Sequence, residues 1–265
     1  MAAGPTTAEQ HARPPRSEPG RPGDGQSGRR PRLTRRRLIV VLAGVAVLFG
    51  LVLWLLYGSS WLKLTGVEVK GTDVLTPRQV ADAARAPIGS PLASLDTGAV
   101  AARVERRLPR VESVEVSRSW PHTLALVVTE RTPVLVMRKG AGFTEVDAHG
   151  VRFDTVAKAP SGVPLLKLSL DPAARSARFP TTRLLREAAA VRASLPREVA
   201  SETSALEVRS YDSVSLKLSG GRTVMWGSGE DGAAKARALV ALMKAVPKAD
   251  HFDVSAPSAP AASAS

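Results

Sequence analysis

The residues able to carry out acid–base or metal chemistry are few in this sequence and lie far apart. Its four histidines are His11, His122, His149 and His251, and their separations fit no metal-ligand spacing. The sequence has no cysteine, which excludes disulfides, thiolate metal sites and a cysteine nucleophile. The composition therefore gives no support to a metal-dependent or thiol-dependent enzyme.

Two short motifs resemble reactive sites at first sight. GSGEDGAAK, residues 227–235, is similar to a phosphate-binding loop, but its Lys is displaced and no Lys-Ser/Thr pair follows the last Gly. Asp147-Ala-His149-Gly150 sets an acid near a histidine, yet it falls between short strands with no nucleophile nearby, and the sequence holds no G-x-S-x-G elbow. We expect both motifs to be turns. The sequence thus predicts no catalytic residue, no metal site and no cofactor, and the protein is not expected to be an enzyme.

A membrane anchor precedes the rest of the chain. Residues 38–57 carry no charge, and about 20 apolar residues at a rise of about 1.5 Å span a hydrocarbon core of roughly 30 Å. The run is too long for the apolar region of a cleaved signal peptide. We expect a transmembrane helix over residues 38–58. At one end of this run the aromatic residues Trp54, Tyr57 and Trp61 favour the membrane interface. At the other end Arg35, Arg36 and Arg37 favour the cytoplasmic side.

The basic excess of the chain is concentrated before this anchor. The net charge is +13, and residues 1–37 alone hold nine Arg against three acids. This arm is rich in Pro, Gly, Arg and Ser, so we expect it to be disordered and cytoplasmic. It could bind nucleic acid or anionic lipid. A topology signal with a solvated tail is the preferred interpretation, because the arm lacks aromatic residues, and nucleic acid is not expected as a partner.

Residues 61–131 show the order strand, helix, helix, strand, strand. The first strand, over residues 64–71, alternates apolar and polar side chains. A capping box from Thr76 to Gln79, with Pro77 in the first turn, starts the first helix. In the second helix, apolar residues recur every four positions. These patterns predict a small α+β domain.

The stretch SRSWPHTLALVVTERTPV, residues 117–134, predicts a hairpin and the joint to a second domain. Trp120-Pro121 is a corner between two strands, in which Pro121 fixes the turn and Trp120 is expected to pack on the sheet or a helix. Pro133 disfavours helix at the residue before it and extends the joint. The residues assigned to this joint are Trp120, Pro121, Glu130, Arg131 and Pro133.

The signals from residue 132 onward are mainly β, with helices between the strands. Gly220-Gly221 predicts a two-residue hairpin between two strands. The Pro, Ala and Ser composition of residues 255–265 predicts a disordered tail. We expect a β domain over residues 132–254, with strands at 134–138, 143–146, 151–153, 205–209, 213–218, 222–226 and 251–254, and helices at 181–195 and through Met243.

Six short segments in a fixed order carry a resemblance to a known family. They are VEVKG (67–71), LPRV (108–111), SRSWP (117–121), ERTPV (130–134), VDAHGV (146–151) and FDVS (252–255). Together, and over roughly residues 35–256, they resemble FtsQ/DivIB, the bitopic cell-division protein family of bacteria. The order strand, helix, helix, strand, strand is similar to a POTRA domain. The resemblance implies an α+β protein with a single transmembrane helix, a POTRA domain and a mixed β domain with flanking helices.

The resemblance also implies a function. Members of the family have no enzyme activity and are single-pass proteins of the bacterial cell membrane, with the N-terminus cytoplasmic and both folded domains outside. They act at the division septum, where they link early and late division proteins. Their partners are chiefly the FtsB/DivIC-like and FtsL-like proteins.

In the family, the partner-binding edge lies in the last strands of the β domain. An exposed sheet edge can accept a strand from a partner. Phe252 and Val254 could instead be plain sheet core. This sequence departs from the family where a Pro, Ala and Ser tail replaces a longer terminal strand. The positions that match the edge are His251, Phe252, Asp253, Val254, Ser255 and Ala256.

Three other classes of function compete with a division scaffold. A POTRA-type chaperone for membrane assembly normally leads into a β-barrel, for which too few residues follow Pro133. A membrane-anchored cell-wall enzyme would need a positioned acid, base or nucleophile. A DNA-linked membrane protein would act through residues 13–37, although basic arms bind DNA weakly in general.

Overall fold

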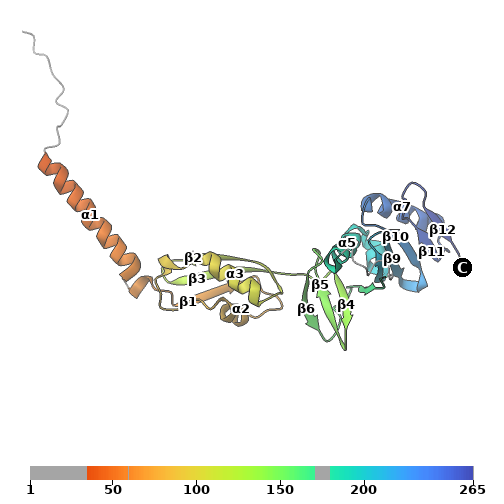
Figure 1. Ribbon diagram of the computed structural model, residues 1–265, viewed down its shortest axis with the longest axis horizontal. Coiled ribbons are helices and arrows are strands. Elements are labelled where there is room, and N and C mark those ends of the chain that lie inside the picture. The colour runs from red at the N-terminus through yellow and green to blue at the C-terminus, as the bar shows by residue number, and fades with distance from the viewer. Residues whose placement is uncertain (1–34, 59, 171–179, 265) are drawn as a thin grey trace, which may run out of the picture. The chain divides into compact units, whose positions relative to one another are not determined.

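The computed structural model describes residues 35–58, 60–170 and 180–264, so the predicted arm over residues 1–34 lies outside the described residues (Figure 1). The helix α1 runs from Arg35 to Gly58 and buries none of its residues. Among the described residues it is the one helix long and apolar enough to cross a membrane. The predicted helix over 38–58 is thus found, and it starts three residues earlier because the three arginines form its first turn.

The first folded domain has the predicted order of elements. A short 3-10 helix, Ser60–Leu62, is followed by strand β1 (Gly66–Lys70) and helix α2 (Pro77–Ala84). A second 3-10 turn, Leu92–Ser94, leads into helix α3 (Thr97–Arg107) and strands β2 (Val111–Ser119) and β3 (Thr123–Glu130). The sheet order is β1-β3-β2, with β1 parallel and β2 antiparallel to β3.

Local sequence signals explain where the two helices of this domain begin. At α2, the Thr76 hydroxyl accepts the Gln79 N–H at 3.3 Å, and the Gln79 amide oxygen accepts the Thr76 N–H at 2.8 Å, which is the predicted capping box. At α3, Asp96 caps by accepting the Ala99 N–H at 2.9 Å. The helices cover one face of the sheet, and their apolar faces form a core with Leu64, Leu92, Leu124 and Leu126.

The second domain is a mixed sheet of nine strands among the described residues (Figure 1). The sheet order is β12-β11-β10-β9-β8-β7-β4-β5-β6. Its strands are β4 (Leu135–Lys139), β5 (Gly142–Val146), β6 (Arg152–Val156), β7 (Leu165–Leu168), β8 (Thr203–Ser210), β9 (Ser213–Leu218), β10 (Thr223–Gly227), β11 (His251–Asp253) and β12 (Ala261–Ser263). Its helices are α5 (Thr181–Ser194), α6 (Arg197–Glu202) and α7 (Gly232–Ala245).

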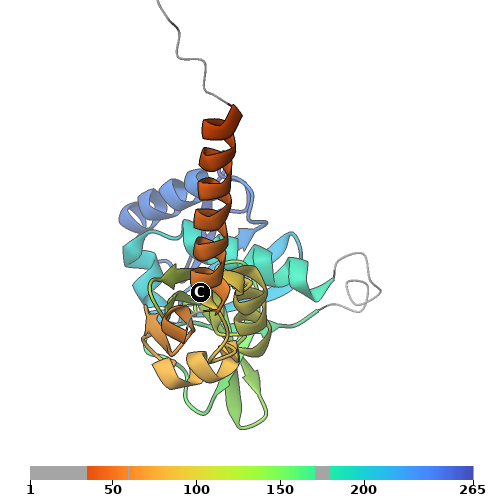
Figure 2. The same ribbon diagram turned by 90° about the vertical axis from the view of Figure 1, so that its left-hand side faces the viewer.

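Along the last strands of this sheet, side chains alternate between a face covered by helices and an open face. Leu216, Val224 and Phe252 point inward, to a core that includes Leu185 of α5 and Leu239 of α7. Both views draw α7, in blue, beside the last strands (Figure 1, Figure 2). The alternate residues of the same strands point to the other face, which these helices leave uncovered.

Two expectations about this domain differ from the structure. The strands β9 and β10 pair antiparallel as predicted, but a 3-10 turn over Ser219–Gly221 and Arg222 make the connection longer than two residues. The tail predicted to be disordered contains β12, because Ala261–Ser263 pair antiparallel with β11. Composition alone missed this strand, since small residues have little intrinsic preference for a sheet and backbone pairing fixes them here.

Candidate functional site

The predicted binding strand is not the outermost strand of the sheet. His251–Asp253 pairs parallel with β10 on one side and antiparallel with β12 on the other. Residue pairs across the outer ladder are His251 with Ser263, Phe252 with Ala262 and Asp253 with Ala261. The edge predicted at His251–Ala256 is therefore displaced by one strand, to Ala261–Ser263.

The six predicted contact residues divide between the core and the surface. Phe252 and Val254 are 3% and 0% exposed and belong to the hydrophobic core, in agreement with the alternative interpretation of these two residues as plain sheet core. His251, Asp253, Ser255 and Ala256 are exposed. The Asp253 carboxylate accepts the Ser255 N–H at 2.9 Å and the Ser255 hydroxyl at 2.7 Å, which fixes the turn after β11. A direct side-chain role in binding is thus open only to the exposed four.

The two edges of the nine-stranded sheet carry different chemistry. Charged side chains, inward-pointing charges and short length are the usual means by which edges resist pairing. The edge strand β6 contains Arg152 and Asp154, and Asp154 is engaged by Arg110 of the first domain. The edge strand β12 is short but has no charged residue and no proline. The described part of the sheet therefore offers its less protected edge at β12.

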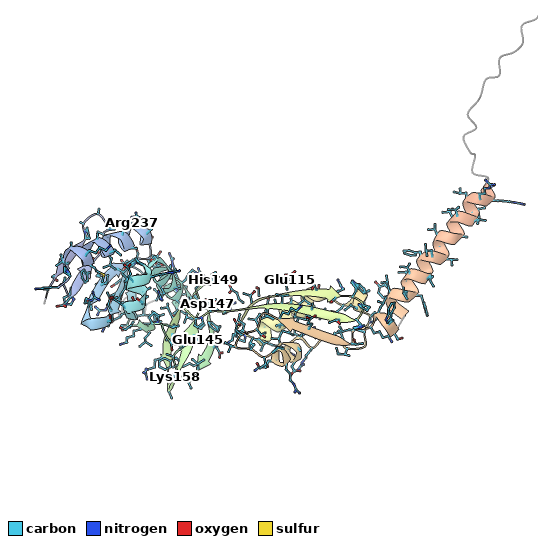
Figure 3. All side chains as sticks on the ribbon, turned by 180° about the vertical axis from the view of Figure 1, so that it is seen from behind. Glu115, Glu145, Asp147, His149, Lys158 and Arg237 are labelled. Atoms are coloured by element: carbon cyan, nitrogen blue, oxygen red, sulfur yellow. The ribbon has the colours of Figure 1, made fainter. Side chains whose placement is uncertain are left out.

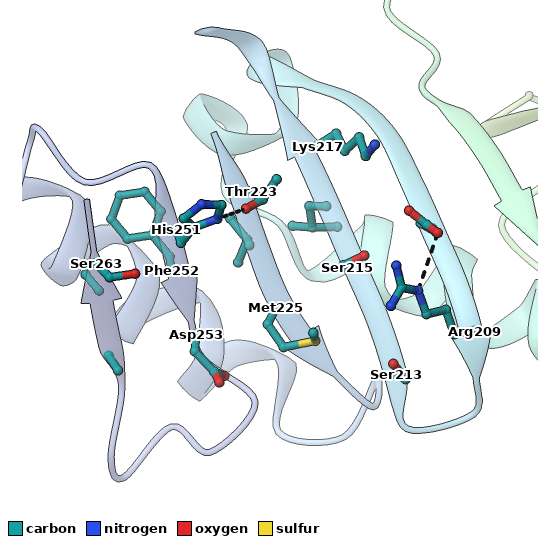
Figure 4. A pocket seen from close by; sticks show the side chains of 15 residues that line it. Arg209, Ser213, Ser215, Lys217, Thr223, Met225, His251, Phe252, Asp253 and Ser263 are labelled. Carbon is teal, nitrogen blue, oxygen red and sulfur yellow. Dashed lines mark hydrogen bonds and ion pairs between the residues drawn. The ribbon is translucent and has the colours of Figure 1, made fainter. Parts of the chain in front are cut away.

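A shallow depression of about 420 Å³ lies on the open face beside this edge (Figure 4). Its lining comes from successive strands and includes the apolar Met225 and the polar residues Arg209, Ser213, Ser215, Lys217, Thr223, His251, Asp253 and Ser263. The Thr223 hydroxyl and His251 Nδ1 are 2.6 Å apart, and Arg209 Nε lies 3.4 Å from a Glu207 carboxylate oxygen. The exposed Met225 shares this depression with charged side chains of both signs, Arg209 and Lys217 against Glu207 and Asp253.

A buried arginine connects the two folded domains. Arg110 is 7% exposed, and its guanidinium binds Asp154 through Nε at 3.0 Å and Nη2 at 2.8 Å. Nη2 also donates to the buried Glu145, and the guanidinium lies 5.2 Å from the centre of the Phe153 ring. Burial disfavours the charge of Arg110, but Asp154 and Glu145 outweigh it and raise the pKa of the guanidinium. Residue patterns assign no role to Arg110, and its place directly after Leu108-Pro109 is the available signal in the sequence.

The Asp147-Ala-His149-Gly150 motif is the predicted turn and also part of this connection (Figure 3). Asp147 accepts the N–H groups of His149 and Val151 at 2.9 and 2.8 Å and an N–H of Arg131. His149 Nε2 lies 3.3 Å from a Glu112 carboxylate oxygen. The acid and the histidine thus serve turn geometry and domain contact, and Arg131 bonds the carboxylate of this turn.

The other predicted joint residues lie at different places in the first domain. β2 and β3 pair Val111 with Glu130 at one end and Ser119 with Thr123 at the other. Trp120 and Pro121 form the turn at the second end, joined by a cis peptide bond, so placing them at the domain joint was wrong. A hairpin arm of eight residues at about 3.3 Å each separates the two ends by roughly 25 Å. Trp120 is 51% exposed, so it does not pack as a core residue.

Glu130 and Pro133 remain at the joint end. The Glu130 carboxylate accepts the N–H groups of Asp73, Val74 and Leu75 at 2.9 to 3.3 Å, which holds the loop before α2. Pro133 lies between the end of β3 and the start of β4.

The phosphate-loop-like stretch is a structural turn between β10 and α7. The ammonium of the buried Lys235 donates to the Ser228 carbonyl at 2.9 Å, and Glu187 accepts the Gly229 N–H. Burial lowers the pKa of Lys235, against the opposing effect of Asp231, Glu230 and Glu187. Within the described residues there is also no group of three His, Cys, Asp or Glu able to hold a metal ion.

The predicted anchor residues lie on α1 and directly after it. Arg35, Arg36 and Arg37 are its first three residues. Trp54 and Tyr57 are exposed in its last turns, and Trp61 follows in the 3-10 helix, with exposed fractions of 65%, 53% and 68%.

Comparison with protein families matches both folded domains. Residues 62–131 match the POTRA domain, FtsQ-type, and residues 135–255 match the C-terminal domain of cell division protein FtsQ/DivIB. The solved extracytoplasmic domain of DivIB from Geobacillus stearothermophilus is 19% identical and covers 45% of this chain and 96% of its own, with a TM-score of 0.32. That structural likeness is too low to support an inference.

Similarity to curated proteins extends over the whole chain. Cell division protein FtsQ of Streptomyces coelicolor is 55% identical over 99% of this chain and 100% of its own length. The Streptomyces collinus protein of the same name is 56% identical over 99% and 100%. The Mycobacteroides abscessus protein of that name is 34% identical over 84% of this chain and 67% of its own. The chain belongs to the FtsQ/DivIB family of bacterial cell-division proteins.

Proposed function

We propose that the protein is a non-enzymatic scaffold of the division septum, which links early and late division proteins and recruits FtsB/DivIC-like and FtsL-like partners. In this proposal it crosses the cell membrane once, with its N-terminus in the cytoplasm and both folded domains outside. The arginines at the start of α1 support this orientation, because basic residues next to a membrane helix favour the cytoplasmic side.

The observation that carries the recruitment proposal is the uncharged edge strand β12. An extended segment of a partner can pair with its outward-facing N–H and C=O groups and continue the sheet. Ala261 and Ser263 would lie directly beside the added strand, and His251 and Asp253, their partners in the ladder, one strand further in. β11 supports the edge from within, since Phe252 and Val254 fix it to the core.

A charge placed on the edge tests this proposal. Lysine on an edge strand opposes pairing with another strand. Ala261→Lys should therefore reduce crosslinking of the protein to FtsB- and FtsL-like partners in dividing cells. Ala259→Lys is the matched control, because Ala259 is also exposed and lies in the turn before β12 rather than in it.

Localisation of the same variants separates the two parts of the proposal. A fluorescent fusion to the N-terminal arm should mark the septum in the parent and in both variants, while only Ala261→Lys loses its partners there. Equal crosslinking of Ala261→Lys and Ala259→Lys would place the binding surface elsewhere. A uniform membrane signal from the stable parent protein would contradict the scaffold function and favour the assembly-chaperone alternative.

A further inference from the structure

Three exposed apolar side chains of the POTRA domain, including both of its exposed tryptophans, lie at one end of it, while Val74 and Val127 are exposed elsewhere on the domain. Trp61, Ile88 and Trp120 are 68%, 60% and 51% exposed and come from three separate segments. They belong to the 3-10 helix before β1, the loop after α2 and the β2–β3 turn. We call these three side chains the apolar rim.

Backbone hydrogen bonds to two adjacent residues bring the three segments together. The Leu64 N–H donates to the Ser90 carbonyl and the Leu64 carbonyl accepts the Gly89 N–H, both at 2.8 Å. The Thr65 N–H donates to the His122 carbonyl at 2.9 Å. Ile88 and Trp120 each lie within two residues of these partners. The rim is therefore a fixed feature of the fold at this end of the domain.

The covalent chain keeps this end close to the membrane. Thr65 follows the last residue of α1, Gly58, by seven positions. Seven residues reach at most about 25 Å when fully extended, and the 3-10 turn in this linker shortens that reach. The opposite end of the domain, with Asp73 and Glu130, is separated from this linker by the length of the strands.

The chemistry of the rim fits a lipid interface. Among the described residues, the large exposed aromatic side chains are Phe49, Trp54, Tyr57 and Trp61 in or next to the anchor, and Trp120. Amphipathic rings favour the headgroup level of a bilayer. The segments 60–65, 85–91 and 120–123 contain Lys63 and Arg85 but no acidic residue. These three segments therefore carry no acidic side chain that anionic headgroups would repel.

We propose that the apolar rim rests in the headgroup region of the bilayer that α1 crosses, so that the POTRA domain is held by the lipid surface as well as by its linker. Trp120 and Ile88 enter the interface, and Trp61 continues the aromatic belt of the anchor. The contact fixes which end of the domain faces the membrane. It is independent of the partner-binding edge, which belongs to the other domain.

The absence of cysteine allows a direct test in the full chain. Ile88→Cys and Trp120→Cys variants would be labelled with an environment-sensitive dye and reconstituted into vesicles that contain phospholipid with a nitroxide-labelled headgroup. Val74→Cys is the matched control, because Val74 is 64% exposed at the opposite end of the same domain. Dye at positions 88 and 120 should lose fluorescence through contact with the nitroxide, and dye at 74 should not. Equal fluorescence at all three positions would overturn the proposal.

A second measurement tests whether Trp120 itself makes the contact. With the dye at position 88, Trp120→Phe should preserve quenching by the labelled lipid and Trp120→Ser should reduce it. Unchanged quenching in Trp120→Ser would show that the end of the domain lies near the membrane only because of its tether, and would also overturn the proposal.

Discussion

Arg110 of the POTRA domain binds Asp154 of the β domain through two nitrogens, Nε at 3.0 Å and Nη2 at 2.8 Å. The same guanidinium neutralises Glu145, whose side chain is 3% exposed. Arg110 thus compensates a buried carboxylate and joins two domains. We therefore expect it to contribute more to the stability of the fold than the exposed ion pairs do.

Arg110→Met should destabilise the protein strongly. Removing one partner of a buried pair leaves the other charge uncompensated, at a cost of about 3–5 kcal/mol. Urea unfolding of the full chain in detergent micelles, followed by near-ultraviolet circular dichroism, would measure the loss. The double variant Arg110→Met/Glu145→Gln should recover part of it, because the buried charge is then gone. Arg209→Met is the control, since an exposed pair contributes only about 0–1 kcal/mol.

Gly150→Ala should be more damaging than Gly162→Ala, although both glycines have φ of +75°. An alanine in this conformation costs about 1–2 kcal/mol wherever it stands. At Gly150 a Cβ would also lie 2.5 Å from the Arg186 nitrogen of α5, whereas nothing lies within 4 Å at Gly162. The same unfolding measurement on both variants gives, as the difference between their losses in stability, the cost of the close contact between this turn and α5. Equal losses would argue against that packing.

Phe252→Ala should lower stability by about 3–5 kcal/mol, the usual cost of truncating a buried phenylalanine. His251→Ala, at the neighbouring exposed position, should cost far less. Partner crosslinking by folded Phe252→Ala protein at low temperature should be retained if Phe252 is a core residue. If the folded variant fails to crosslink while its stability is unchanged, Phe252 contacts the partner directly.

The lowered pKa of Lys235 predicts a specific dependence of stability on pH. The unfolded chain holds this proton up to the ordinary lysine value of 10.5, and the folded chain releases it earlier. Between the two values the unfolded state binds more protons, so the contribution of Lys235 to the free energy of unfolding rises with pH. Below both values the full penalty for the buried charge is present. Urea unfolding from pH 7 to 10.5 should show that the free energy of unfolding of the parent rises relative to that of Lys235→Met. A difference in free energy of unfolding that stays constant over this pH range would contradict the prediction.

Local signals predicted most elements of the fold. The capping box at Thr76 and Gln79 and the alternation in β9 depend on neighbouring residues, so the sequence displays them directly. The order of strands in the β domain depends on pairing between distant segments, as in the parallel pairs β4–β7 and β7–β8. Residue patterns do not encode such pairings, because any apolar strand can neighbour any other.

The candidate site shows the same division. From the sequence, Phe252 could be a core residue or a partner-contact residue. The position of its strand, β11, between β10 and β12 shows that it is a core residue. β12 was missed because Ala261-Ala262-Ser263 has no apolar alternation, and its pairing with β11 defines it. Arg110 was missed because its carboxylate partners lie 35 and 44 residues away in the sequence.

The junction between β4 and β7 has a mechanical consequence. One residue pair, Val136 with Leu165, joins these strands in register, whereas four pairs join β7 to β8. Arg110 and Arg131 fasten the POTRA domain to the strands β4 to β6, while β12 lies at the far side of the sheet. Tension applied between the anchor and the last strand is carried across this junction by that one ladder pair together with the packing of α5 against the turn at Gly150. Under load we expect the sheet to separate first between β4 and β7, so that β4, β5 and β6 detach together with the POTRA domain.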